Sequence, residues 1–341
     1  MTSKRTGFYA AVVAGIVALV AVPQTMDMFT VMQLTGFVAM AVFALSQGFV
    51  WGFAGIMSFG QAAFLGLGAY SYAVAAINFG ESTPAMAVGI LVPVIFAGLL
   101  GYFMFYGRIS DAYVGVITMT TSIILFNLIN STSGDAYRVG EAALGGFNGI
   151  PSVPTLNIPG DPEAVLDPNQ LWYVTMGCLI LCYIALHAVL RSRFGAVTVA
   201  IRENETRVTL LGYDARFYKL VAFMFSAAVA GLAGCLYTNW GAYISPTIFA
   251  LAISAQAIIF VLVGGLGTLI GPILGAFVLQ WLMSSVGQQS VLDANLVMGA
   301  VLIVFVLLVP KGVVPLIRDT LWPMLQHRFG ARSSLEKEAH E

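Results

Sequence analysis

Charged residues are scarce in this chain of 341 amino acids, and their scarcity excludes most soluble folds. Asp, Glu, Lys and Arg together make up 9% of the residues, whereas hydrophobic residues make up 59%. Soluble globular domains carry roughly 25% charged and about 45–50% apolar residues. The chain is therefore predicted to be an all-α polytopic membrane protein. It has no basic stripe of the kind that binds nucleic acid, so nucleic acid is excluded as a partner.

Cysteine and catalytic motifs are also sparse. The three cysteines, Cys178, Cys182 and Cys235, lie in apolar stretches and form no C-x-x-C pair, so we interpret them as buried hydrophobic residues and predict no metal site. The sequence has no G-x-x-x-x-G-K-[ST] loop and no nucleophile–base pair, so we expect neither ATP hydrolysis by this chain, nor another enzymatic activity, nor a cofactor. Ionisable residues are nearly absent from the apolar runs, which argues against a proton relay.

The apolar residues are arranged in ten runs that we interpret as transmembrane helices. Their approximate bounds are 7–23, 29–46, 61–78, 84–106, 113–129, 171–190, 218–239, 250–263, 271–286 and 294–309. With the amino terminus inside, every basic residue except Arg138 falls on the cytoplasmic side, as the positive-inside rule requires. We therefore predict a transmembrane domain over residues 1–310, with both termini cytoplasmic.

Three segments need a separate interpretation: the first apolar run, the longest external loop and the carboxy-terminal tail. The run 7–23 follows Lys4 and Arg5 and also resembles a secretory signal peptide, but its end is a poor cleavage site, which favours a retained anchor. The acidic, Gly- and Pro-rich loop 131–170 is predicted to lie outside, as a cap over the external mouth or a contact for an external partner. The tail 311–341 is predicted to be cytoplasmic, partly as an interfacial helix that contacts membrane lipid.

The segment 191–219 holds the densest group of basic residues. It lies between two long apolar runs and is therefore predicted to be a cytoplasmic loop. Glu203 and Glu205 interrupt its positive field, and the run 199–211 is compatible with a helix, so we predict a helical docking surface for a cytoplasmic partner. The six basic residues are Arg191, Arg193, Arg202, Arg207, Arg216 and Lys219.

Two glycine-rich stretches, 51–70 and 264–276, each join one apolar run to the next on the cytoplasmic side. Both are compatible with a broken helix that lines a cavity, and equally with close helix packing through small residues. A polar solute in the membrane needs replacement hydrogen bonds from neutral polar groups and exposed backbone. Candidate pathway residues are Ser58, Phe59, Gln61, Thr118, Gly264, Gly265, Gly267 and Thr268. For the other polar residues of the runs, among them Gln33, Gln256 and Gln280, we favour hydrogen bonds between helices.

Several motifs along the chain resemble those of one transporter family. They are Ser58-Phe59-Gly60-Gln61, Gly68-Ala69-Tyr70, Arg191-Ser-Arg-Phe-Gly195, Ala200-Ile-Arg-Glu-Asn-Glu205, Leu211-Gly212-Tyr213, Ala230-Gly-Leu-Ala-Gly234, Ser245-Pro246 and Gly264-Gly-Leu-Gly-Thr268. Together they are similar to the branched-chain amino acid permeases of bacterial ABC importers, and most similar to the M type of the paired permease subunits.

The resemblance implies an ABC importer permease fold in the bacterial inner membrane and import of branched-chain or other hydrophobic amino acids. The implied partners are a second, homologous permease subunit, two cytoplasmic ATP-binding subunits and a periplasmic substrate-binding protein. Coupling to the ATPase is assigned to Arg202, Glu203, Asn204, Glu205 and Gly212, although the segment departs from the family's usual Glu-Ala-Ala pattern. Related urea permeases share much of this pattern, so a urea or short-amide permease is an alternative, as is a stand-alone channel.

Overall fold

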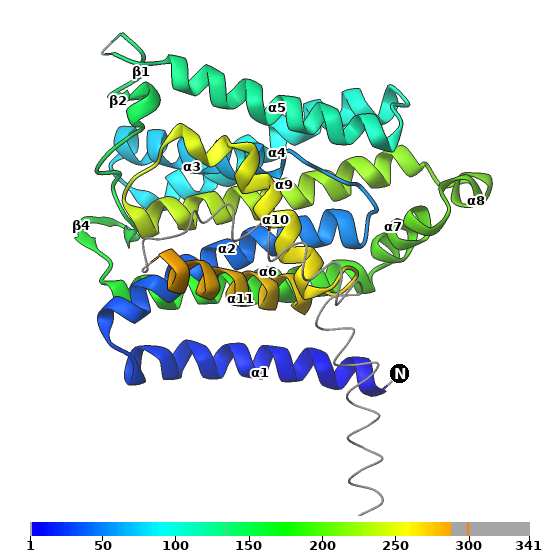
Figure 1. Cartoon of the computed structure of the whole chain (residues 1–341), viewed down its shortest axis with the longest axis horizontal. Coiled ribbons are helices and arrows are strands. Elements are labelled where there is room, and N and C mark those ends of the chain that lie inside the picture. The colour runs from blue at the N-terminus through cyan, green and yellow to red at the C-terminus, as the bar shows by residue number, and fades with distance from the viewer. Residues whose placement is uncertain (1, 135, 288–298, 300–341) are drawn as a thin grey trace, which may run out of the picture.

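The computed structural model describes residues 2–134, 136–287 and 299, and most of these residues are helical (Figure 1). The predicted span 294–309, apart from residue 299, and the predicted tail lie outside the described residues. The helices are α1 (Thr2–Thr25), α2 (Met28–Gly52), α3 (Gln61–Phe79), α4 (Ser82–Tyr106), α5 (Asp111–Ser131), α6 (Pro168–Arg191), α7 (Arg193–Glu203), α8 (Glu205–Leu210), α9 (Ala215–Gly241), α10 (Leu251–Gly264) and α11 (Ile270–Gly287), with 3-10 turns η1 (Gly146–Asn148) and η2 (Pro246–Phe249).

Seven helices of the described chain, α1 to α6 and α9, are long and apolar enough to cross a membrane. The predicted spans 250–263 and 271–286 coincide with the shorter apolar helices α10 and α11. Helix α10 has 14 residues, which is about 21 Å at 1.5 Å per residue. A bilayer core is about 30 Å thick, so α10 alone does not reach from one surface to the other.

Polar structure gathers at the two ends of the helix bundle. Helices α7 and α8 lie at one end, where the amino terminus also lies, and the strands lie at the opposite end (Figure 1). The strands form two antiparallel pairs, β1 (Arg138–Val139) with β2 (Ala142–Ala143) and β3 (Asn157–Ile158) with β4 (Asp161–Val165). These strands belong to the loop between α5 and α6. Two backbone hydrogen bonds between Ile150 and Ile244, of 2.8 and 3.2 Å, join this loop to the segment after α9.

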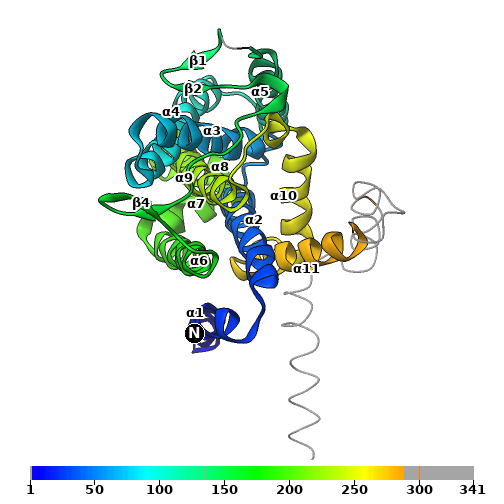
Figure 2. The same ribbon diagram turned by 90° about the vertical axis from the view of Figure 1, so that its left-hand side faces the viewer.

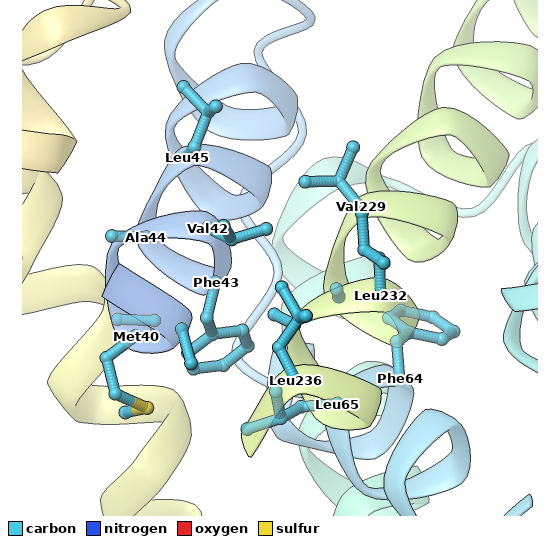
Figure 3. Close-up of a cluster of buried hydrophobic side chains, with 14 of the residues drawn as sticks. Met40, Val42, Phe43, Ala44, Leu45, Phe64, Leu65, Val229, Leu232 and Leu236 are labelled. Atoms are coloured by element: carbon cyan, nitrogen blue, oxygen red, sulfur yellow. The ribbon is translucent and has the colours of Figure 1, made fainter. Parts of the chain in front are cut away.

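Helix α2 is the central helix, and nearly all of its side chains beyond the first turn are buried. It packs against α6, α9, α10 and α11. Phe43 of α2, Phe64 of α3 and Leu236 of α9 meet in one apolar cluster (Figure 3). In a membrane such packing gains from van der Waals contact rather than from removal of water.

Helices α3, α4 and α9 approach one another closely through glycines. A Cβ atom at Gly68 would lie 2.4 Å from the carbonyl oxygen of Gly231, and one at Gly234 would lie 2.1 Å from that of Leu65. A Cβ atom at Gly89 would meet the Cys235 sulfur at 2.3 Å. The packing interpretation of the first glycine-rich stretch is therefore confirmed for Gly68.

Helix α1 packs mainly along α6, with a smaller contact to α2, and lies at the edge of the bundle (Figure 2). The rings of Phe8 and His187 stack with centroids 4.1 Å apart, and Trp172 Nε1 donates a hydrogen bond to the carbonyl of Leu19 at 3.1 Å.

Neutral polar side chains also connect helices, as predicted. Gln256 of α10 donates to Gln280 of α11 at 3.1 Å, and Gln33 of α2 donates to the Ser284 hydroxyl of α11.

The contact between α3 and α9 generates a stability prediction. Replacing Gly234→Ala adds a methyl group where the Leu65 carbonyl leaves no room, and overpacking of this kind costs about 1–3 kcal/mol. We expect a lower midpoint of thermal unfolding for the purified variant in detergent. Gly177→Ala is the matched control, because nothing lies within 4 Å of the added atom. Equal midpoints for the two variants would contradict the packing described here.

Candidate functional site

The chain between α2 and α3 forms a break in otherwise helical structure. We call residues 53–60 the helix break; Ala54, Ile56, Ser58 and Gly60 are buried in it, alternating with half-buried neighbours. The break leads back from the end of α2 to the start of α3 (Figure 1). Gln61, the first residue of α3, bonds to Ser46, which precedes the end of α2 by six residues and hence by about 9 Å. Helix α3 therefore begins inside the bundle.

A network of neutral side chains surrounds the start of α3. Gln61 Nε2 donates to the Ser46 and Ser226 hydroxyls at 3.0 and 2.7 Å, and Ser226 in turn donates to the Ser46 carbonyl at 3.0 Å. Gln47 Nε2 donates to the Ser58 carbonyl at 3.1 Å. We call these residues the polar layer, and each has an exposed fraction of 0%. Its members are Ser46, Gln47, Ser58, Gln61 and Ser226.

The polar layer contains three buried oxygen atoms without a hydrogen-bond partner among the described residues. They are Gln47 Oε1, Ser58 Oγ and Gln61 Oε1. The Gln61 amide cannot simply be reversed, because the Ser46 and Ser226 hydroxyls donate to backbone carbonyls and must accept from its nitrogen. An unsatisfied buried polar group costs about 1–3 kcal/mol. The polar layer can therefore accept hydrogen bonds from a ligand that carries N–H or O–H donors.

Helix α5 supports the other side of the helix break. The backbone amide of Phe59 donates to Thr118 Oγ1 at 3.2 Å. A Cβ atom at Gly60 would lie 1.9 Å from the Thr118 carbonyl oxygen, and one at Gly115 would lie 2.8 Å from the Phe59 ring. Four predicted pathway residues, Ser58, Phe59, Gln61 and Thr118, are thus brought together, although Thr118 braces the backbone rather than lining open space.

The remaining predicted pathway residues lie elsewhere, at the turn between α10 and α11. The Thr268 hydroxyl donates to the Gly265 carbonyl at 2.9 Å and accepts from the Gly271 amide at 3.2 Å, which caps α11. A Cβ atom at Gly264 would lie 1.9 Å from the carbonyl oxygen of Gly271. Gly267, with φ of +79°, lies against Gly52 at the end of α2. This turn therefore contacts the end of α2, next to the start of the helix break.

The predicted docking element is divided into two helices. We call residues 192–214 the α7–α8 segment. Ser192 Oγ accepts from the Gly195 amide at 3.3 Å and so caps α7, and Asn204 Oδ1 accepts from the Arg207 amide at 2.9 Å and so caps α8. The single helical run predicted over 199–211 is therefore wrong in one respect, since the chain is extended at Asn204, where φ is −163°.

Each residue that the resemblance assigned to coupling has a contact or backbone role within this chain. Glu205 Oε2 lies 2.6 Å from Lys219 Nζ of α9, and the Arg202 guanidinium donates to the Gly52 carbonyl and pairs with Glu203. Gly212, with φ of +90°, follows the end of α8 in a conformation that suits glycine.

The sequence analysis missed the apolar tip of α8. Leu210 and Leu211 have exposed fractions of 82% and 77%, and α8 lies at the far end of the molecule (Figure 1). Two adjacent leucines within the basic segment 191–219 were the available signal.

Two pockets lie at opposite ends of the bundle. One has a volume of about 410 Å³ and lies between the α4–α5 turn and the start of α9; its charged lining residues are Arg108, Asp111, Glu205, Asp214, Arg216 and Lys219. The other has a volume of about 250 Å³, lies beside η2 and is largely apolar, with hydroxyl groups from Tyr237, Tyr243, Ser245 and Thr247.

Comparison with known proteins places this architecture in a family. Residues 29–307 match the family described as branched-chain amino acid transport system / permease component. The chain is 27% identical over 317 residues to the high-affinity branched-chain amino acid transport system permease protein LivM of Escherichia coli, which covers 85% of this chain and 70% of that protein.

More distant relatives come from other organisms. The probable branched-chain amino acid transport permease protein LivM of Methanocaldococcus jannaschii is 24% identical and covers 69% of this chain and 74% of its own length. The xylose/arabinose import permease protein XylH of Sulfolobus acidocaldarius is 25% identical and covers 66% of this chain and 61% of its own length. No solved structure matches the chain significantly.

The family match spans most of the chain, and the motifs that carried the resemblance lie within it. The seven apolar helices agree with a transport component that crosses the membrane several times. The chain therefore belongs to the branched-chain amino acid permease family of ABC transporters and is a multi-pass membrane protein.

Proposed function

We propose that the chain is a permease subunit of an ABC importer that carries branched-chain or other hydrophobic amino acids across the bacterial inner membrane. It pairs with a second, homologous permease subunit and is driven by two cytoplasmic ATP-binding subunits, while a periplasmic binding protein delivers the solute. The family match and the LivM relatives support this assignment. The XylH relative carries a sugar by name, so the choice of solute needs support from the site itself.

The polar layer is the observation that carries the proposal. Its three free oxygen atoms are acceptors, or in the case of Ser58 a hydroxyl that accepts or donates. An amino acid presents an ammonium group with three N–H donors, which these oxygens suit. The carboxylate suits the amino-terminal end of α3, because the helix dipole favours negative charge there and α3 begins inside the bundle. All five residues of the polar layer are fully buried. An amino acid therefore fits between them only after the layer opens.

The α7–α8 segment supports a motor on the cytoplasmic side. Adjacent exposed leucines at a helix end are apolar anchors of the kind that fill a partner's pocket, and the surrounding basic residues favour a position of this surface inside the cell. The same segment contacts the end of α2 and the helix break through Arg202, which bonds to the Gly52 carbonyl and lies against Gly55. A partner that binds at Leu210 and Leu211 therefore pulls on an element that is already connected to the polar layer.

Uptake by a reconstituted complex tests the proposed function. The chain, its partner permease and both ATP-binding subunits are placed in proteoliposomes with the binding protein on the outer face. We expect ATP-dependent uptake of labelled leucine that is inhibited by valine and isoleucine but not by urea or xylose. Uptake without ATP would indicate a channel, and inhibition by urea alone would indicate the urea and short-amide alternative.

The apolar tip of α8 generates a prediction about assembly. Replacing Leu210→Asp and Leu211→Asp together puts two charges where an apolar contact is proposed, so we expect recovery of the ATP-binding subunits with the tagged chain to fall about tenfold or more. The control is Phe147→Asp, which changes an exposed aromatic residue at the opposite end of the bundle. Unchanged recovery of the ATP-binding subunits with the double variant would contradict docking at this tip.

The polar layer generates a prediction about accessibility. Ser58→Cys and Gln61→Cys place thiols at positions with no exposed surface, so we expect both to resist a small, membrane-impermeant thiol reagent in the resting complex. During ATP-driven transport their labelling should rise several-fold, because a solute path to the layer must open. The parent chain, whose three cysteines are buried or half-buried, sets the background. Lack of labelling in every transport state would contradict a path through this layer.

A further inference from the structure

We propose that the α7–α8 segment holds the helix break at both of its ends, and that Arg202, Lys219 and Asp111 are positioning residues that transmit its movement to the polar layer. This inference rests on the proposed function, since it requires an ATP-driven partner that moves the α7–α8 segment. It gives two residues outside the predicted coupling set, Lys219 and Asp111, a part in transport.

The first connection runs through Arg202, in the last turn of α7. Its guanidinium donates a hydrogen bond to the carbonyl of Gly52, the last residue of α2, where a cation is favoured by the helix dipole. A Cβ atom at Gly55 would lie 2.7 Å from Arg202 Cγ, so the side chain rests directly on the break. Glu203 Oε1 accepts from Arg202 Nε at 3.2 Å and orients the guanidinium. Displacement of α7 therefore displaces the start of the helix break.

The second connection begins at Lys219 of α9. Its Nζ lies 2.6 Å from Glu205 Oε2 and 3.3 Å from Asp111 Oδ1. Glu205 is the first residue of α8, and Asp111 is the first residue of α5. The Lys219 side chain has an exposed fraction of only 12%, so water and salt screen these pairs less than they screen open surface pairs. Lys219 therefore joins α8 to the start of α5.

Helix α5 carries this connection to the far end of the break. Asp111, Gly115 and Thr118 are spaced i, i+4 and i+7, which places them on one face of the helix. Gly115 and Thr118 lie against Phe59 and Gly60, and they are about 6 and about 10 Å along the helix axis from Asp111. Both connections thus end on the same eight-residue break, one at Gly55, close to the end of α2, and the other at Phe59 and Gly60, immediately before Gln61.

The ion pairs of Lys219 with Asp111 and Glu205 contribute little to the stability of the fold. The Asp111 side chain is 69% exposed and the Glu205 side chain 45% exposed, and ion pairs with exposed partners typically stabilise by less than 1 kcal/mol. A variant that removes the pairs is therefore expected to fold and assemble. We expect such a variant to transport less solute for each ATP that is hydrolysed.

The experiment measures leucine transported per ATP hydrolysed in the reconstituted complex, together with the amount of complex assembled. Lys219→Met keeps the length of the side chain and removes its charge, and we expect the ratio to fall roughly five- to tenfold with normal assembly. Lys219→Arg should recover at least half of the native ratio. Arg216→Gln is the control, since its guanidinium lines the same pocket but forms no ion pair with the described residues; it should leave the ratio unchanged.

A double-mutant cycle tests whether the two acids act along one path. Asp111→Asn and Glu205→Gln should each lower the ratio, and the double variant should be no worse than the poorer single variant, because either change already opens the connection. The inference would be overturned if the losses of the two single variants multiplied in the double variant, or if Lys219→Met kept the native ratio of leucine to ATP. Either result would leave the proposed function intact. Should Lys219→Met not assemble, the exposed Asp111→Asn tests the α5 connection alone. A native complex without ATP-dependent uptake would overturn both proposals.

Discussion

The helix break depends on one constraint, that backbone polar groups away from water must find partners within the protein. An unbroken helix satisfies its own backbone, but in residues 53–60 only the first part bonds back to α2, through the amides of Phe53, Ala54 and Ile56. Side chains from other elements bond the backbone further on: Gln47 donates to the Ser58 carbonyl, Thr118 accepts from the Phe59 amide, and Ser254 accepts at 3.0 Å from the amide of Ala62 in the first turn of α3. The positions of α2, α5 and α10 around the break follow from these bonds.

Small residues let these elements approach the break closely enough. Gly60 and Gly115 bring α5 against the break, and Gly52 brings the turn between α10 and α11 against the end of α2. The same means joins α3 to α9, where Gly68 and Gly234 lie against backbone carbonyls. Glycines therefore allow both the close packing of helices and the close approach of other elements to the helix break. The two interpretations of the glycine-rich stretches, a broken helix and close helix packing, are compatible.

Sequence patterns predicted the apolar helices well, because hydropathy over a long run is a local property. They also left a broken helix as one of two interpretations of the stretch that contains Ser58 and Gln61, and they predicted a helical basic segment. Contacts between residues that are far apart in the sequence could not be predicted. Nothing in the sequence pairs Gln61 with Ser226, Lys219 with Asp111, or Arg202 with Gly52. The glycines at 264–267 were grouped with Ser58 because both stretches are rich in glycine and join two apolar runs, whereas in the fold Gly264 packs against Gly271 and Gly267 lies beside Gly52 at the end of α2.

If the α7–α8 segment acts on the helix break as proposed, residues 53–60 move during transport. Amide hydrogen exchange of the peptide that covers residues 53–61, measured in the assembled complex with and without bound ATP, tests this most directly. We expect ATP binding to accelerate exchange in this peptide by at least about tenfold, while the contact between α3 and α9 around Gly68 and Gly231 keeps its protection. Identical exchange of residues 53–61 in both states of a complex that transports its solute would contradict this proposal.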